Sequence, residues 1–169
     1  MSFPPTKSNA TPHNEVGKGF VLGPDDGDAY WWLGSLTLNK VTRTSTDGNV
    51  DIVDHRVPPG YAPPPHIHRD QDEIFYVIDG HFAVRCGDDH WQAGPGSLVF
   101  LPRGVPHGFT LSNDAPGRTL LINAPAGFAD LISELGQSTN ELVIPGPDVA
   151  MPSPEHAGEV SEKHGIFGA

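Results

Sequence analysis

The chain has 169 residues, among them 20 glycines and 18 prolines. This length suits one domain with a sizeable core, and the frequent glycine and proline favour short strands and turns over long helices. The formal net charge of −11 disfavours binding to nucleic acid or to an anionic membrane surface.

The sequence gives no sign of secretion or of a membrane anchor. No apolar run approaches the ~18 residues of a transmembrane helix, and residues 1–15 hold no apolar segment of the kind a secretory signal contains. Cys86 is the single cysteine, so an internal disulfide is excluded. We therefore expect a cytoplasmic protein without a membrane or nucleic-acid partner.

In chain order, the first 28 residues show no clear period and predict an N-terminal arm. Residues 30–38 (YWWLGSLTL) predict the first strand. Residues 41–46 and a turn at residues 47–49 follow it, and residues 50–57 (VDIVDHRV) predict the next strand. We expect residues 1–28 to form the arm, residues 29–125 a barrel, and residues 126–169 a C-terminal helix and tail that pack on the barrel.

Two histidines come next, on a segment that three prolines hold extended. The prolines at positions 63–65 rule out a helix, and side chains alternate between the two faces of a strand. His66 and His68 therefore project to the same side. The composition of residues 73–79 (EIFYVID) predicts a strand that begins at Glu73. We therefore expect the Glu73 carboxylate to lie near the two imidazoles.

Turns and further strands complete an all-β pattern. Asp79 and Gly80 predict a two-residue hairpin turn, after which residues 81–86 return as the partner strand. A turn near residues 88–89 follows, and further strands are predicted at residues 97–101, 108–112 and 118–124. Strands separated by turns at this spacing are typical of an all-β sandwich or barrel.

The C-terminal part predicts two short helices. Apolar residues at helical spacing between Phe128 and Leu135, ended by Gly136, indicate one helix that covers the barrel. Ser153 followed by Pro154 is typical of a helix start, and this second helix should end near Gly165.

His107 joins the first two histidines and Glu73 as a candidate metal ligand. An H-x-H pair alone is a weak motif in a chain with 9 histidines, but its combination with Glu73 and the PRGVPH segment indicates a four-ligand site. Three imidazoles and one carboxylate suit one divalent transition metal ion, with Fe, Mn, Ni, Co, Cu and Zn all open.

These residues resemble the two signature motifs of the cupin superfamily. The first motif is matched by Gly60, His66, His68, Glu73 and Gly80, and the second by Gly96, Pro102, Gly104 and His107. Leu111 departs from it, standing where the family often has Asn, a residue that does not bind the metal. The resemblance implies an all-β fold: a single cupin barrel (a double-stranded β-helix or jelly roll) with one or two short C-terminal helices.

Within that superfamily the chain is similar to small single-domain bacterial cupins grouped with quercetin 2,3-dioxygenases. The resemblance implies a metal held by His66, His68, Glu73 and His107, with Glu73 also accepting a proton from the substrate. It further implies a metal-dependent dioxygenase that cleaves a ring or C–C bond of a flavonol-like or enolisable aromatic small molecule with O₂.

Five residues are candidates for the wall of a substrate pocket. Strand parity places Phe75 and Val77 on the face of Glu73, and Phe109 on the face of His107. Tyr61 and Trp32 are further candidates. The alternative for the first three is that they simply fill the barrel. The histidines outside the motifs are expected to be surface or structural residues: His13, His55, His81, His90, His156 and His164.

Two other classes of function stay open. The first is a non-redox metal enzyme, such as an isomerase, polyketide cyclase, decarboxylase or lyase. The second is a module that binds small molecules around a structural metal. The arm and the open sheet edges also lead us to expect a homodimer.

Overall fold

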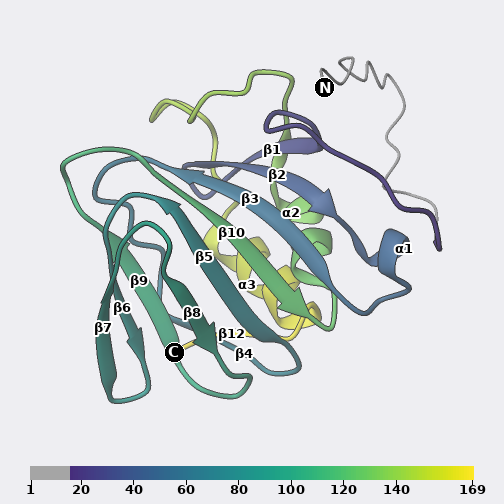
Figure 1. Ribbon diagram of the computed structural model, residues 1–169. Coiled ribbons are helices and arrows are strands. Elements are labelled where there is room, and N and C mark those ends of the chain that lie inside the picture. Colours follow the sequence, from purple (N-terminus) through teal and green to yellow (C-terminus); the bar gives the residue numbers. More distant parts are fainter. Residues whose placement is uncertain (1–15) are drawn as a thin grey trace.

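Two antiparallel sheets face each other in the computed structural model, which describes residues 16–169 (Figure 1). Most of the predicted arm, residues 1–15, lies outside the described residues. The larger sheet has the order β11 (Gln137–Ser138), β1 (Asp28–Trp32), β2 (Ser35–Val41), β3 (Asp51–Val57), β10 (Gly117–Ala124), β5 (Asp72–Asp79) and β8 (Leu98–Leu101). The smaller sheet has the order β12 (Ile166–Gly168), β4 (His66–His68), β9 (His107–Leu111), β6 (Phe82–Cys86) and β7 (Asp89–Ala93).

The core lies between the two sheets because residues alternate along each strand. On β5, Glu73, Phe75 and Val77 point inward and are buried, whereas Tyr76 and Ile78 are exposed. On β10, every second residue from Gly117 is buried in the same way. The predicted all-β barrel of the jelly-roll type is thus confirmed.

The two predicted C-terminal helices are present. Helix α2 (Phe128–Leu135) is followed by Gly136, and α3 (Pro154–Lys163) begins after Ser153, whose hydroxyl accepts a hydrogen bond from the His156 backbone N–H. A further short helix, α1 (Arg43–Thr46), precedes the turn at residues 47–49.

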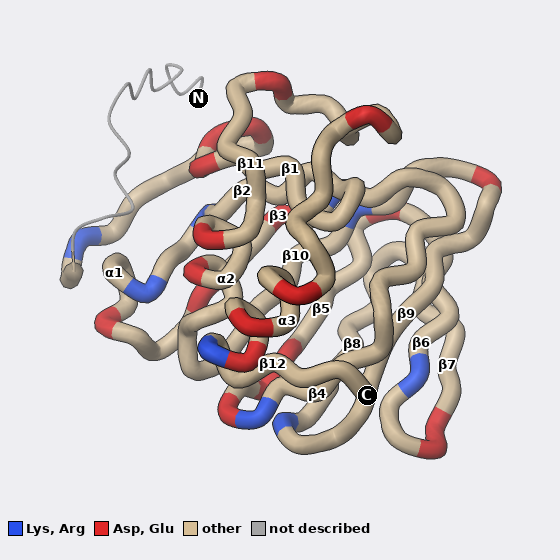
Figure 2. Tube along the Cα trace, turned by 180° about the vertical axis from the view of Figure 1, so that it is seen from behind, with Lys and Arg blue, Asp and Glu red and all other residues tan. Residues whose placement is uncertain are grey.

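Both helices are tied to the barrel and to each other. The buried Asp51 carboxylate accepts hydrogen bonds from the backbone N–H groups of Gly127 and Ala129, which fixes the start of α2. The Glu134 carboxylate on α2 contacts Lys163 and His164 at the end of α3. Figure 2 shows the two helices side by side, with acidic residues on both. No helix of the described part is long and apolar enough to cross a membrane.

The predicted first strand is in fact two strands. Residues 30–38 are split by a tight turn at Leu33 and Gly34, with φ of +48° and +76°. A two-residue hairpin turn of this kind needs positive φ at both positions, and glycine or asparagine normally supplies it. Gly34 does so, but leucine rarely adopts this conformation, so the sequence does not signal the turn.

The predicted hairpin at Asp79 and Gly80 is also wrong. Strand β5 belongs to the larger sheet, and β6, which follows Gly80, pairs with β7 and β9 in the smaller one. Gly80 does have a positive φ of +94°, but there the chain turns a corner between sheets. A Cβ at this position would lie 2.8 Å from Leu111 Cδ1, so the corner has no room for a side chain.

Candidate metal centre

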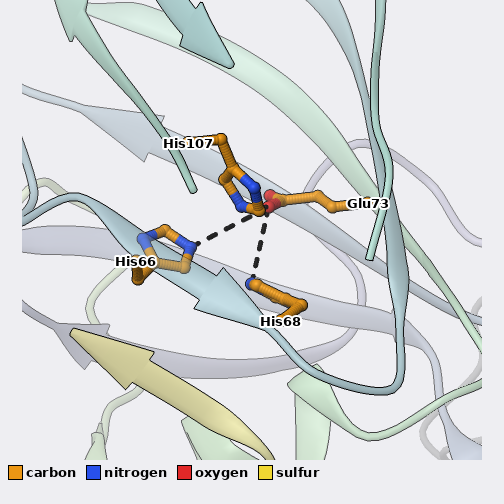
Figure 3. A group of neighbouring side chains, drawn as sticks. All are labelled: His66, His68, Glu73 and His107. Atoms are coloured by element: carbon orange, nitrogen blue, oxygen red, sulfur yellow. Dashed lines mark hydrogen bonds and ion pairs between the residues drawn. The ribbon is translucent and has the colours of Figure 1, made fainter. Parts of the chain in front are cut away.

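Four side chains from three strands meet inside the barrel. His66 and His68 come from β4, His107 from β9 and Glu73 from β5 (Figure 3). One potential ligand atom of each lies within 4.8 Å of the others. Glu73 Oε2 lies 3.2 Å from His107 Nε2, 3.6 Å from His68 Nε2 and 4.0 Å from His66 Nε2. The structure therefore brings together the four residues that the sequence singled out.

Each imidazole is oriented by an oxygen acceptor at its Nδ1 atom. Nδ1 of His66 lies 3.1 Å from the Pro64 carbonyl, and Nδ1 of His107 lies 2.9 Å from the Val105 carbonyl. Nδ1 of His68 lies 3.3 Å from Gln71 Oε1. Carbonyl oxygens only accept hydrogen bonds, so in the neutral rings Nδ1 carries the proton. The lone pairs are left on the three Nε2 atoms, on the side of Glu73.

Burial and mutual charge set the protonation of this cluster. Burial lowers the pKa of His68 to about 4 and also lowers the pKa of His66, although Glu73 opposes both shifts. Burial alone would raise the pKa of Glu73, but the contact with His107 and the positive charge of the neighbouring imidazoles when they are protonated lower it to about 2. Near neutral pH, Glu73 is therefore ionised while His66 and His68 are neutral.

This arrangement fits a divalent transition metal ion. His68 Nε2 is buried and has no hydrogen-bond partner in the described part of the chain. A buried polar atom without a partner is costly, and a cation would satisfy it together with the other two imidazoles and the carboxylate. Nitrogen and carboxylate donors suit Fe, Mn, Ni, Co, Cu or Zn, and three neutral rings with one carboxylate leave a divalent ion a net charge near +1.

A largely apolar cavity of about 260 Å³ borders the cluster at His66 and Glu73. Its wall comes mainly from the barrel interior and from α2, α3 and β12. The lining residues include Trp32, His55, Phe109, Leu121, Phe128, Leu131, Gly158 and Phe167. Neither Lys nor Arg occurs among the described residues that line it. A larger, more open groove of about 620 Å³ lies at Arg85 and Trp91 and includes none of the four cluster residues.

The five pocket candidates fall into two groups. Trp32 and Phe109 line the cavity. Phe75 and Val77 are buried behind the wall, with the Phe75 ring 5.8 Å from that of Phe109, so they fill the barrel, which is the alternative that the sequence left open. Tyr61 is likewise buried, and its ring packs against Phe109 at 6.1 Å without lining the cavity.

His55 is the site residue that the sequence interpretation missed. It is 1% exposed and lines the cavity, among the rings of Trp32, Tyr61 and Phe109. The alternation of β3 offered a signal, because His55 lies between Val53 and Val57, two apolar positions of the inward face. The charged residues on either side of it in sequence hid that pattern.

Comparison with known proteins relates part of this barrel to one family. Residues 53–123 match the model of the cupin domain. This part of the chain is similar to a cupin domain. The matched range includes all four residues of the cluster, and it supports placing the protein in the cupin superfamily.

Other known proteins are similar to parts of this chain in sequence or in fold. The chain is 48% identical over 52 residues to an acireductone dioxygenase of Yarrowia lipolytica, a match that spans 28% of this chain and about 30% of that protein. The structure is similar to KdgF from Halomonas sp. (TM-score 0.56, 18% identity, 64% of this chain and 94% of that chain). It is also similar to the polyketide cyclase RemF from Streptomyces resistomycificus (TM-score 0.55, 22% identity, 63% and 80%). These structural matches show the cupin fold alone.

Proposed function

We propose that the protein is a metal-dependent cupin dioxygenase that acts on a flat, largely apolar molecule with an enol or phenol group, of the flavonol-like class. The observation that carries this proposal is the position of Glu73 and His66. Both belong to the four-residue cluster and both line the apolar cavity, so a ligand in the cavity reaches the centre directly. An acireductone dioxygenase that shares part of the sequence supports the dioxygenase class.

The residues that line the cavity favour a substrate that is uncharged or weakly acidic. Its walls are mostly aliphatic and aromatic, and its volume of about 260 Å³ lies just below the ~300–1,000 Å³ typical of ligand pockets. A phosphate or a polycarboxylate would find no Lys or Arg among the described lining residues, and it would meet the carboxylate of Glu162. A compact aromatic enol meets these conditions.

The four cluster residues would hold the metal, and the other residues of the cavity would shape the reaction. When bound, a divalent ion supplies Lewis acidity, which makes a hydroxyl or enol group beside it more acidic. The ionised Glu73 carboxylate can then accept the proton that this group loses. Phe109, Leu121 and Phe128 exclude water around the resulting anion, which reacts with O₂ so that a ring or C–C bond is cleaved.

To test this proposal, the purified protein is reconstituted separately with Fe²⁺, Mn²⁺, Co²⁺, Ni²⁺, Cu²⁺ and Zn²⁺. Each form is incubated with a panel of flavonols and other aromatic enols, O₂ uptake is recorded with an electrode, and products are identified by mass spectrometry. We expect O₂ consumption that matches substrate loss, with both atoms of ¹⁸O₂ in the product. Product formation without O₂ uptake would instead indicate a non-redox metal enzyme, and binding without turnover would indicate a binding module.

A further inference from the structure

The outer face of the larger sheet carries large apolar side chains that are exposed to solvent. On β5 and β8 the residues that point away from the core are apolar: Leu98 is 64% exposed, Phe100 53%, Tyr76 40% and Ile78 37%. In Figure 1, β10 and β5 pass in front of α3, so this helix lies on the other side of the sheet. These side chains belong neither to the core nor to the proposed metal centre.

The strand register joins the exposed residues into two rows, which we call the apolar face. The first row runs across β8, β5, β10 and β3 and consists of Phe100, Ile74, Ile122 and Ile52. The second row runs across β8, β5 and β10 and consists of Leu98, Tyr76 and Leu120. The residues of β10 and β3 and Ile74 are partly exposed, and Ile78 extends the face along β5. None of these eight residues is charged.

The charged residues that flank the apolar face form ion pairs. At one end, the Arg103 guanidinium donates a hydrogen bond of 2.8 Å to the Asp72 carboxylate. At the other end, Arg118 Nε donates one of 3.0 Å to the buried Asp54 carboxylate. An anionic membrane or a strongly charged protein would therefore find few free charges to bind, and the net charge of −11 disfavours the membrane further.

We propose that the apolar face binds the same face of a second copy, so that the protein is a homodimer whose larger sheets pack on each other. A second copy offers a matching surface that is flat, apolar and uncharged. Two sheets pack face to face at about 10 Å, and a two-fold axis closes the assembly. The arm and the sheet edges led to the expectation of a homodimer from sequence, whereas this inference places the contact on a sheet face. It depends neither on the metal nor on the proposed function.

The exposed area is close to what a stable dimer needs. If a large side chain presents roughly 200 Å² when fully exposed, the four most exposed residues contribute about 400 Å² in each copy. With the partly exposed members of the rows, two copies would remove roughly 1,000 Å² of apolar surface from water before any polar rim is counted, and stable interfaces begin near ~1,200 Å² in total.

A monomer would leave this face in water. Single exposed apolar residues are ordinary, but a contiguous patch of this size lies at the upper end of what monomers show. The patch also includes β8, which is the last strand in its sheet, and an apolar strand at a sheet edge promotes aggregation when it is left open. Packing against a second copy removes the patch from water.

Sedimentation velocity of the full-length protein over a range of concentrations measures the association. We expect a species of about twice the 18.1 kDa of one chain. Leu98→Lys and Phe100→Lys place a charge in the contact and should each raise the dimer dissociation constant at least about tenfold. Trp91→Lys is the matched control, because Trp91 is 47% exposed on β7 of the smaller sheet, and it should leave the dimer intact. Circular dichroism checks that the variants are folded.

Nitration of tyrosine, mapped by mass spectrometry, tests the position of the contact. Tyr76 should react slowly in the parent dimer and rapidly in the folded Leu98→Lys and Phe100→Lys variants, whereas the buried Tyr61 should stay unreactive in all three. Reaction of Tyr61 would reveal a variant that has unfolded, and the parent dimer and the other variant then decide the result.

Several results would overturn the proposal. One is a parent protein that stays monomeric up to about 100 μM. Another is a dimer that both lysine variants leave intact, or one in which Tyr76 reacts as fast as in the variants, since the contact would then lie on another face. A monomer that binds vesicles of phosphatidylcholine would assign the apolar face to a membrane instead.

Discussion

His66 and His107 stand directly opposite each other on the antiparallel pair β4 and β9, with ring centroids 4.7 Å apart. This register joins two sequence motifs that lie about forty positions apart. Glu73 reaches the same point from β5 in the other sheet, so the cluster bridges the two layers of the barrel. Substitution of the residues that orient these side chains should therefore change the metal affinity more than it changes the stability of the fold.

Gln71 is the clearest of these positioning residues. Its side chain is buried and its Oε1 faces Nδ1 of His68 at 3.3 Å. Gln71→Met removes the acceptor at similar volume and should weaken metal binding about 10-fold to 100-fold, as is usual when the partner of a ligating histidine is lost. Competition with a chromophoric chelator measures the affinity. Gln71→Glu keeps an acceptor and serves as the control; equal affinities in Gln71→Met and the parent would show that His68 does not depend on this bond.

Glu73→Gln tests the carboxylate as a proton acceptor. The change keeps the shape of the side chain but removes the negative charge of the carboxylate, whose pKa is lowered to about 2. We expect turnover to fall by about 10²-fold or more, as for the loss of a general base, while the three imidazoles retain most of the metal. Steady-state rates and elemental analysis of the same samples give the comparison. Full turnover in the variant would exclude the proton-accepting role.

Gly158 offers a way to narrow the cavity without disturbing the core. It is exposed, lies inside α3 and lines the cavity, and a Cβ placed on it would meet nothing within 4 Å. Gly158→Phe should reduce substrate affinity by occupying this space, and Gly158→Ala should stabilise the protein by about 1 kcal/mol because glycine is a poor helix former.

Glu159→Phe is the matched control for that variant, since Glu159 is the exposed neighbour on the same helix and does not line the cavity. Ligand titration and thermal melting distinguish the two changes. If both phenylalanine variants bind the ligand equally well, Gly158 does not form part of the ligand's space.

The metal-free protein should lose stability as the pH falls from 6.5 towards 4. Burial lowers the pKa of both His55 and His68 to about 4. Between this value and the ~6.5 of an unfolded chain, the unfolded state binds protons that the folded state does not, so acid favours unfolding. One such histidine contributes roughly 2 kcal/mol between pH 6.5 and pH 5.

His55→Phe should remove the part of this pH dependence that comes from His55, whereas the contributions of His68 and His66 remain. Urea unfolding at pH 7 and pH 5 with a chelator present measures it. Contributions from carboxylates such as Asp51 are common to both proteins and cancel in the comparison. An identical loss of stability in parent and variant would mean that His55 is protonated at similar pH in the folded and unfolded states.

The four cluster residues could be predicted from the sequence because their types and spacings are features of short segments and of the two-residue period of a strand. The His66 and His68 spacing fixes a common side on any strand, and the inward parity of Glu73 with Phe75 and Val77 holds in the structure. The helices at residues 128–135 and 154–163 followed from apolar spacing and from the Ser153 cap in the same way.

Sheet membership and the cavity wall depend on long-range packing and could not be obtained in this way. Gly80 has the positive φ that a turn of the predicted type requires, but a local turn signal does not say whether the chain returns in the same sheet or crosses to the other. Parity placed Phe75 inward without deciding between core and cavity, and that outcome depended on the position of Phe109 in front of it.

Metal binding by parent and variant proteins tests the central claim most directly. Equilibrium dialysis against Zn²⁺ and Co²⁺ followed by elemental analysis should give about one ion per chain for the parent and for His90→Ala, which changes an exposed histidine outside the cluster. His68→Ala and His107→Ala should remain folded by circular dichroism and retain far less metal. If these two variants hold as much metal as the parent, the four side chains do not form the metal centre.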